Sequence, residues 1–312
     1  MSAAVGSGLP LLAVTLPQFS ERPGPALEAA TDARRLGFAG AFVFDHLWPL
    51  GAEGRTRPAL ECWTLLAAVA AATGAPENPE GSGEPRRGAP ENPGPGFRVG
   101  TLVTRAGLRA PAVVARMAAT VGEAAGAPLV VGIGRGDLAN RAENLAFGLP
   151  FGDPAERAAA VEATVAALRG PLAGTPAPEV WVGGTGPGAR DLAGRVADGW
   201  NGWALTPEEL AAGLAGVRRA AELAGRDPAA VAGTWGGQVL VAPDRREAEA
   251  RLTRWAPGRP PAELARVVAG DPGTVMGRLA ELGDAGAAWC VLATVGGPGA
   301  EMRELLAAAL NS

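Results

Sequence analysis

The sequence predicts an α/β protein in which eight parallel strands, each followed by a helix, close into a (β/α)8 TIM barrel. Short apolar runs alternate with stretches of helical periodicity along the 312 residues, and eight such runs are present. The runs are continuously apolar instead of alternating, which is typical of a parallel sheet covered by helices on both faces. A barrel fits this order best, and a doubly wound open sheet is the alternative.

The strand predictions rest on runs of Val, Leu, Ile, Phe and Trp that end at Gly, Pro or charged residues. They fall at residues 11–16, 41–44, 98–104, 129–134, 179–183, 198–203, 237–241 and 288–292. The helix predictions rest on apolar spacing and on capping residues, such as Asp153 followed three residues later by Glu156. They fall at about residues 25–36, 58–74, 111–121, 188–196, 274–282 and 301–310, with further helices opening at 153, 206 and 244.

Residues 74–96 differ in composition from the rest of the chain. They consist mainly of Pro, Gly, Glu and Asn, and the run Gly-Ala-Pro-Glu-Asn-Pro occurs in them twice. Such a segment buries little apolar surface, so we predict a disordered or loosely ordered insertion on the surface, before the third strand. Because strands and helices resume their alternation after it, we expect residues 1–312 to form a single barrel domain.

The overall charge and hydropathy exclude several classes of partner. The net charge of −4 gives no electrostatic reason to expect nucleic acid or an anionic membrane as a partner. No apolar run is long enough to span a membrane, and the first residues lack the pattern of a signal peptide, so we expect a cytoplasmic protein. Cys62 and Cys290 each lie in an apolar context, which favours two buried free thiols over a disulfide.

Missing residue types exclude several kinds of chemistry. The chain contains no lysine, which excludes Schiff-base enzymes and the P-loop. One histidine and two distant cysteines cannot assemble a common zinc site, so we predict no metal centre. No serine lies in a G-x-S-x-G motif, so serine hydrolase chemistry is also excluded.

The single histidine, His46, follows the second predicted strand directly. In a parallel barrel the catalytic residues lie at the carboxyl ends of the strands. An imidazole there can polarise a carbonyl group or take a proton from an alcohol, because its ordinary pKa lies near neutrality. The alternative is a histidine that caps the following turn. Asp45 precedes it, so one of the two side chains points out of the barrel, and Asp45 either supports His46 or is a structural hydrogen-bond acceptor.

Other polar and glycine residues follow other predicted strands, and the barrel would bring them near His46. Asp137 ends the glycine-rich run 132–137, where it is either an acid or hydrogen-bond partner in the barrel mouth or a solvated residue of a turn. The remaining members of this set are Thr104, Gly183, Gly184, Thr185 and Asn201. Trp48, Trp200 and Trp203 also lie at strand ends, where a flat conjugated ring can pack against them.

A glycine-rich loop at residues 183–189 follows the fifth strand and precedes a helix. Backbone N–H groups and the helix dipole at such a place favour a phosphate group. The loop also matches the G-x-G-x-x-A pattern of dinucleotide-binding folds, but it lies in the fifth unit instead of the first. We therefore predict phosphate binding without the dinucleotide interpretation. Five arginines between residues 245 and 259 read mainly as a solvated helix face, with one or two available to an anionic cofactor.

Several segments resemble the bacterial luciferase-like monooxygenase superfamily, and they occur in the same order. They are residues 42–48, 60–67, 100–104, 109–112, 132–137, 143–148, 182–185 and 197–201. The Asp45-His46 pair is most similar to the branch that uses the deazaflavin coenzyme F-420 in place of FMN. The resemblance implies a TIM barrel, hydride transfer at the deazaflavin ring, a small-molecule substrate and commonly a homodimer.

The resemblance also implies roles for individual residues. His46 would lie over the coenzyme as an acid, base or polarising group, and Asp137 would act with it. Leu102 and Val103 would form a bulge behind the ring, where the family often has a non-prolyl cis peptide. The other expected coenzyme contacts are Asp45, Thr104, Asn140, Gly183, Gly184 and Thr185. Some family members place cationic residues on the coenzyme phosphate after the sixth strand, where this chain has Ala204, Leu205 and Thr206.

The expected function is therefore an oxidoreductase that transfers a hydride between F-420 and a small organic substrate. The first alternative is an FMN-dependent monooxygenase with the same fold. Two others belong to different classes: a non-catalytic flavin or deazaflavin carrier, and a barrel hydrolase that uses Asp45 and Asp137.

Overall fold

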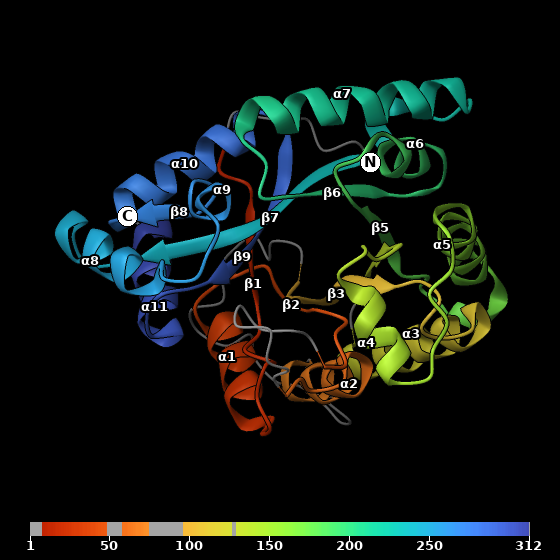
Figure 1. Cartoon of the computed structure of the whole chain (residues 1–312), viewed down its shortest axis with the longest axis horizontal. Coiled ribbons are helices and arrows are strands. Elements are labelled where there is room, and N and C mark those ends of the chain that lie inside the picture. Colours follow the sequence, from red (N-terminus) through yellow and green to blue (C-terminus); the bar gives the residue numbers. More distant parts are fainter. Residues whose placement is uncertain (1–7, 49–57, 75–95, 127–128, 312) are drawn as a thin grey trace, which may run out of the picture.

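A closed barrel of eight parallel strands forms the centre of the molecule. The structure is a computed structural model that describes residues 8–48, 58–74, 96–126 and 129–311 (Figure 1). Each strand pairs in parallel with the next, and β9 pairs with both β7 and β1, which closes the ring. The strands are β1 (Leu11–Thr15), β2 (Gly40–Val43), β3 (Arg98–Arg105), β4 (Val130–Gly134), β5 (Glu179–Gly183), β6 (Gly199–Trp203), β7 (Ala232–Val241) and β9 (Ala287–Thr294). The predicted TIM barrel is confirmed, and the open-sheet alternative is wrong.

Helices surround the barrel on its outer side (Figure 1). The main ones are α1 (Gly24–Arg35), α2 (Cys62–Thr73), α3 (Pro111–Ala125), α5 (Pro154–Arg169), α6 (Pro187–Val196), α7 (Pro207–Leu223), α8 (Arg245–Trp255), α10 (Pro272–Asp284) and α11 (Gly299–Leu310). Shorter elements are α4 (Asn140–Ala146), α9 (Pro261–Leu264), and the 3-10 turns Pro171–Ala173 and Pro228–Ala230. None of the helices in the described ranges is long and apolar enough to cross a membrane.

The helix starts follow the capping signals of the sequence. Asp153 accepts hydrogen bonds from the N–H groups of Ala155 and Glu156, and the Glu156 carboxylate accepts from the Asp153 N–H. This reciprocal arrangement satisfies donors that a helix start otherwise leaves open. Thr206 and Glu209 form the same box at the start of α7.

Several elements differ from the prediction. α2 begins at Cys62, four residues after the expected start, because the Glu61 carboxylate caps it. β7 begins at Ala232 instead of Gly237, because Gly233 and Gly236 leave room for the side chains of Leu214 and Trp203. A short strand, β8 (Val268–Gly270), lies beside the end of β7 and was not predicted.

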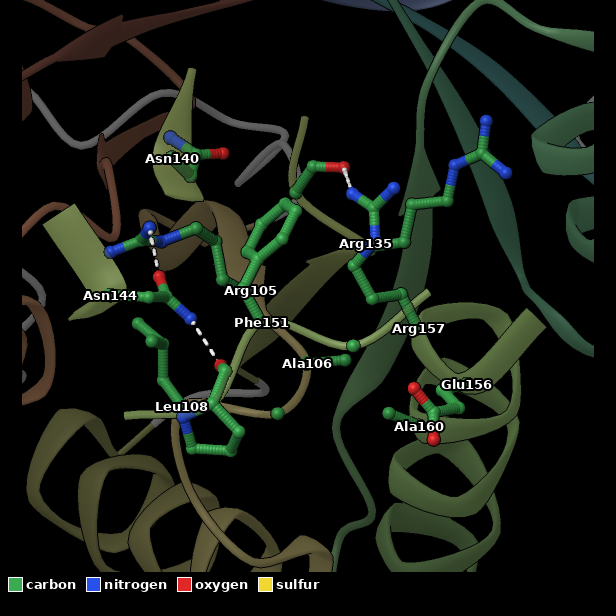
Figure 2. Close-up of a pocket in the computed structure, with 14 residues that line it drawn as sticks. Arg105, Ala106, Leu108, Arg135, Asn140, Asn144, Phe151, Glu156, Arg157 and Ala160 are labelled. Carbon is green, nitrogen blue, oxygen red and sulfur yellow. Dashed lines mark hydrogen bonds between the residues drawn. The ribbon is translucent and has the colours of Figure 1, made fainter. Parts of the chain in front are cut away.

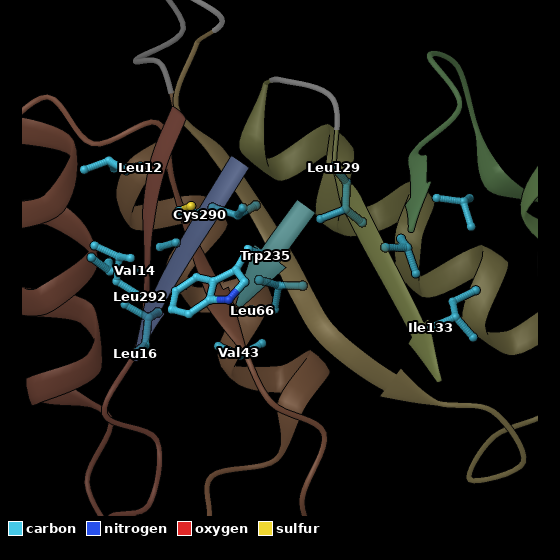
Figure 3. Close-up of a cluster of buried hydrophobic side chains, with 14 of the residues drawn as sticks. Leu12, Val14, Leu16, Val43, Leu66, Leu129, Ile133, Trp235, Cys290 and Leu292 are labelled. Atoms are coloured by element: carbon cyan, nitrogen blue, oxygen red, sulfur yellow. The ribbon is translucent and has the colours of Figure 1, made fainter. Parts of the chain in front are cut away.

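The core has two layers separated by the barrel wall. Inside the barrel, Phe42 stacks on Trp181 with centroids 5.4 Å apart, and Trp289 meets Trp181 edge-on at 5.7 Å. Between the strands and helices lies a larger apolar layer that includes Leu66, Ile133 and Cys290 (Figure 3). Cys62, also a buried free cysteine, belongs to the same layer. Because aromatic rings fill the barrel interior, ligands have access only to its rim.

The low-complexity insertion predicted at 74–96 lies outside the described residues, apart from Gly74 and Gly96. The expected disorder and single-domain organisation therefore stay predictions.

Candidate functional site

Two cavities lie at the carboxyl ends of the strands and meet at three shared residues: Phe44, His46 and Trp203. The first, here called the glycine-side cavity, has a volume of about 690 Å³ and is bounded by the ends of β3 to β6. The second, here called the aromatic cavity, has a volume of about 950 Å³ and is bounded by the ends of β1, β7 and β9 and by the α8–α9 loop. His46 therefore stands at the junction of two spaces, each large enough for a small molecule.

His46 is held by a buried carboxylate. Its Nδ1 lies 3.2 Å from Oε2 of Glu143 on α4, whose side chain is 4% exposed. Oε1 of Glu143 accepts hydrogen bonds from the backbone N–H groups of Leu47 and Trp48, and Arg105 lies 3.1 Å from Oε2. One carboxylate thus fixes both the imidazole and the turn that follows it.

Glu143 is ionised in the working range of pH. Burial alone would raise its pKa, but the hydrogen bonds from His46 and Trp48 and the charge of Arg105 outweigh burial and lower the pKa from 4.5 to about 2. An ionised carboxylate only accepts hydrogen bonds, so Nδ1 of His46 carries a proton. The other ring nitrogen, Nε2, is then the one that can exchange a proton with a ligand.

Asp45 has a different environment from its neighbour. Its carboxylate is fully buried and forms a two-pronged ion pair with Arg109, at 2.8 and 3.1 Å. Arg109 also binds Glu61, the residue that caps α2, and Asp45 accepts the Arg105 N–H at 3.0 Å. Asp45 contributes to the wall of the glycine-side cavity, and its carboxylate anchors the end of β2 to α2 and α3.

The bulge expected at Leu102 and Val103 is present. The peptide bond between them is cis, and the register of β3 with β4 shifts between Thr101 and Thr104. Both residues line the glycine-side cavity. A Cβ at Gly134 or Gly183 would lie 2.6 or 2.8 Å from a methyl carbon of Val103, so these glycines leave the space that the bulge occupies. Thr104 is fully buried and lines neither cavity.

The other predicted residues lie around the same cavity. Gly183, Gly184, Thr185, Asp137 and Asn140 all line it. Asp137 is exposed, and its carboxylate accepts the N–H of Ala139 at 2.9 Å, while Asn140 Oδ1 accepts the Asp137 N–H at 2.9 Å. Asp137 thus shapes the turn before α4 as well as bordering the cavity.

Sequence reasoning missed the arginines of this cavity. Arg135 has no ion-pair partner among the described residues, and a Cβ at Gly186 or Gly188 would lie 3.9 Å from its guanidinium nitrogens. Arg135 therefore lies beside the start of α6, whose N-cap, Gly186, provides no side-chain cap. The sequence places Arg135 within the glycine-rich run 132–137, which was already a candidate for the site. Its nearness to α6 could not be predicted, because it depends on the tertiary fold.

A side pocket of about 250 Å³ shares Arg105, Arg135 and Arg157 with the glycine-side cavity (Figure 2). The Arg157 guanidinium lies 4.5 Å from the centre of the Phe151 ring and donates to the Gly136 carbonyl at 2.9 Å. Figure 2 shows Arg105 on the other side of that ring, bonded to Asn144. Arg105 is paired with Glu143, so the positive charge on this side of the rim comes from Arg135 and Arg157, for which the described residues provide no carboxylate partner.

Of the tryptophans expected at strand ends, Trp203 alone of the three lines the cavities. Its ring meets Phe44 edge-on at 5.7 Å. Trp200 is fully buried and donates to the Gly184 carbonyl at 2.8 Å, and Trp48 is 44% exposed. Among the arginines between residues 245 and 259, Arg259 lines the aromatic cavity, whereas Arg245, Arg251 and Arg254 pair with glutamates on or near α8.

Comparison with solved structures supports the fold. An F420-dependent secondary alcohol dehydrogenase in complex with an F420-acetone adduct has a TM-score of 0.73 and 18% identity, covering 97% of this chain and 98% of that one. The coenzyme F420 dependent tetrahydromethanopterin reductase of Methanopyrus kandleri has a TM-score of 0.69 and 18% identity, covering 96% and 98%. At this identity the likeness shows the fold alone.

Curated relatives are more similar in sequence over shorter segments. A phthiodiolone/phenolphthiodiolone dimycocerosates ketoreductase of Mycobacterium kansasii is 30% identical over 215 residues, which is 62% of this chain and 52% of the relative. An F420-dependent glucose-6-phosphate dehydrogenase of Beutenbergia cavernae is 31% identical over 191 residues, 54% of this chain and 49% of the relative. The chain thus spans about half the length of these relatives.

The family itself is shown by a match over most of the chain. Residues 96–298 match the model of the luciferase-like monooxygenase family, an oxidoreductase family by its name. This range includes the bulge, the glycine-rich strand ends and Glu143, and the resemblance noted in the sequence is confirmed. The chain belongs to the luciferase-like monooxygenase family.

Proposed function

We propose that this protein is an oxidoreductase that transfers a hydride between the deazaflavin coenzyme F-420 and an alcohol or ketone, with His46 moving the accompanying proton. The observation that carries the proposal is the position of His46 at the junction of two cavities, with Nδ1 held by Glu143 and no hydrogen-bond partner for Nε2 among the described residues. The F420-dependent glucose-6-phosphate dehydrogenase of Beutenbergia cavernae, 31% identical over 191 residues, supports the choice of coenzyme.

The glycine-side cavity fits a flat ring with an anionic tail. Leu102 and Val103 would provide an apolar surface against such a ring, and glycine backbone at residues 183–186 would let a ligand approach closely. The start of α6 and the guanidinium of Arg135 together suit a phosphate group. When bound, F-420 would supply the hydride donor or acceptor at its ring.

The protein supplies the proton and the position of the substrate. With Nδ1–H held by the Glu143 carboxylate, His46 can take a proton from an alcohol at Nε2, or give one to the oxygen of a ketone. Glu143 stays ionised while this happens and stabilises the imidazolium form. The aromatic cavity on the other side of His46 is the place for the rest of the substrate.

The hydrolase alternative has little support in this geometry. The Asp45 carboxylate is fully buried and occupied by Arg109, so it has no free oxygen with which to activate water. Asp137 is exposed and acts in a turn.

Titration of the purified protein with F-420, FMN and riboflavin tests the proposal. We expect F-420 to bind most tightly. We also expect the absorbance of F-420 to change when a secondary alcohol is added without oxygen, and only when the protein is present. Tighter binding of FMN with oxygen consumption would favour the monooxygenase. Binding of F-420 without turnover of any alcohol or ketone would favour a carrier. A homodimer, expected from the resemblance, stays a prediction that sedimentation of the same sample would test.

A further inference from the structure

We propose that the substrate is an uncharged, mainly apolar alcohol or ketone of drug-like size, whose non-reacting part lies in the aromatic cavity. The inference rests on the proposed function and adds to it the class of substrate. Hydride transfer beside His46 does not in itself fix the size or charge of the substrate. The walls of the aromatic cavity carry that information.

The volume of the cavity argues for a substrate much larger than acetone. At about 950 Å³ it lies near the upper end of the range, about 300–1,000 Å³, that ordinarily holds drug-sized ligands. It begins at His46 and Trp203 and extends to Trp255 and Pro260 beside α9. A reacting carbon held near His46 therefore leaves most of this space for the remainder of the molecule.

Aromatic rings line the part of the cavity nearest His46. Phe19 and Phe44 stack with centroids 6.1 Å apart, and Phe19 lies 5.8 Å from the imidazole. Trp203 extends the same wall beyond Phe44. Trp255 lines the far end of the cavity. Such rings provide large apolar contact areas, so they stabilise an apolar chain or ring that leaves water.

The charged groups of the cavity disfavour an anionic substrate. Arg259 lies 3.7 Å from the centre of the Trp255 ring and 3.9 Å from the Glu263 carboxylate. Arg303, only 8% exposed, has its Nη2 3.4 Å from Asp32. Each arginine thus lies within 4 Å of a carboxylate, which reduces its Coulomb attraction for a second anion.

The number of charged groups in the wall of the aromatic cavity leads to the same conclusion. Within the described part of the wall, Glu28, Asp32 and Glu263 give three carboxylates against the two guanidinium groups. Asp32 is also paired with Arg35 at 3.2 Å, so a phosphate or carboxylate group on the substrate would meet no net positive charge in this wall. The cavity therefore favours a ketone with an apolar body over a sugar phosphate.

A series of ligands tests the proposal without any coenzyme. Trp203 and Trp255 line the cavity, so tryptophan fluorescence can follow binding of the 2-ketones from acetone to 2-undecanone. We expect the dissociation constant to fall ~4-fold for each added methylene, the factor that corresponds to about 0.8 kcal/mol for a buried CH₂. A keto acid of equal length with a terminal carboxylate should bind at least about tenfold more weakly. Affinity that does not depend on chain length, or tighter binding of the keto acid, would overturn the proposal.

Variants locate the effect in the cavity. In Trp255→Ala the dissociation constant of the longer ketones should depend less on chain length, whereas Trp255→Phe should keep most of this dependence. The matched control is Leu223→Ala, which removes an exposed apolar side chain at the end of α7. An unchanged dependence in Trp255→Ala, with the protein still folded by circular dichroism, would contradict the assignment.

The outcome can be separated from that of the proposed function. If long ketones bind as expected but F-420 is never reduced or oxidised, the hydride transfer is wrong and the ligand class stands. If F-420 turns over best with a phosphorylated or carboxylated substrate, the hydride transfer stands and the inference is wrong.

Discussion

The two cavities that meet at His46 differ in nearly every property that governs binding. The glycine-side cavity is bounded by backbone and by Arg105, Arg135 and Arg157, with the start of a helix at one edge. The aromatic cavity is bounded by stacked rings and has more carboxylates than guanidinium groups. These differences are the basis of the proposal that an anionic coenzyme binds on one side of the imidazole and an uncharged apolar substrate on the other. The predictions below test this division, from the largest expected effect to the smallest.

Replacing the residue at the junction should affect chemistry more than binding. We expect His46→Gln to lower kcat by about 10²–10⁴-fold, the usual contribution of a positioned general acid or base. The affinity for F-420 and for long ketones should change only a few-fold, because the walls of both cavities remain. Pre-steady-state reduction of F-420, with binding measured separately, checks both statements. Unchanged turnover would remove the proposed role of His46.

Removing the carboxylate that binds His46 should lower the stability of the protein by an amount that depends on pH. The pKa of Glu143 is 4.5 in an exposed setting and about 2 in the folded chain, so its contribution to stability is fully present above pH 4.5 and is lost as the pH falls toward 2. We expect Glu143→Gln to lower the free energy of unfolding by roughly 2–4 kcal/mol at pH 7. This gap between the unfolding free energies of the original protein and the variant should narrow toward pH 2. Urea unfolding at several pH values measures this gap.

The control for that experiment is Glu222→Gln, an exposed residue near the end of α7. It should leave stability unchanged within about 0.5 kcal/mol at each pH. A gap for Glu143→Gln that does not change with pH would show that the ionised carboxylate is not what stabilises this turn.

Removing the exposed cation of the glycine-side cavity should have the smallest effect. We expect Arg135→Gln to weaken F-420 binding about fivefold to tenfold at low salt, and less at high salt, since an exposed charge is screened. Riboflavin, which lacks a phosphate, should bind equally well to both proteins. Arg219→Gln, an exposed arginine of α7, makes the same change of charge elsewhere. If Arg135→Gln weakened riboflavin binding as much as F-420 binding, Arg135 would lie near the coenzyme ring instead of the coenzyme phosphate.

The fold could be predicted because its signals are local. Continuous apolar runs gave the eight barrel strands, and the capping residues at Asp153 and Thr206 gave the starts of two helices. The first half of β7 was not predicted because it contains glycines instead of an apolar run. Gly233 and Gly236 lie against Leu214 and Trp203, and no local sequence pattern reveals these contacts. β8 has only three residues and lies beside β7, so it provides no pattern of its own.

The site was predictable only in part, for a related reason. His46 and the bulge at Leu102 and Val103 lie at strand ends, where topology alone places them. Glu143 lies on α4, a helix of seven residues that is too short to show periodicity. Its contact with His46 joins residues 97 positions apart. The sequence therefore identified His46 as the candidate residue, and the structure identified Glu143 as the side chain that binds it.

The end of β3 joins the two functional parts of the rim. Val103 forms the bulge, and two residues later Arg105 donates through Nε to the Asp45 carbonyl at 2.8 Å and contacts Glu143. A displacement of this strand that moved the bulge would also carry Arg105, and with it the carboxylate that orients the imidazole. Under the proposed function, one strand end therefore positions both the bulge behind the coenzyme ring and the imidazole that moves the proton, so a substitution that displaces Val103 should also change the orientation of His46.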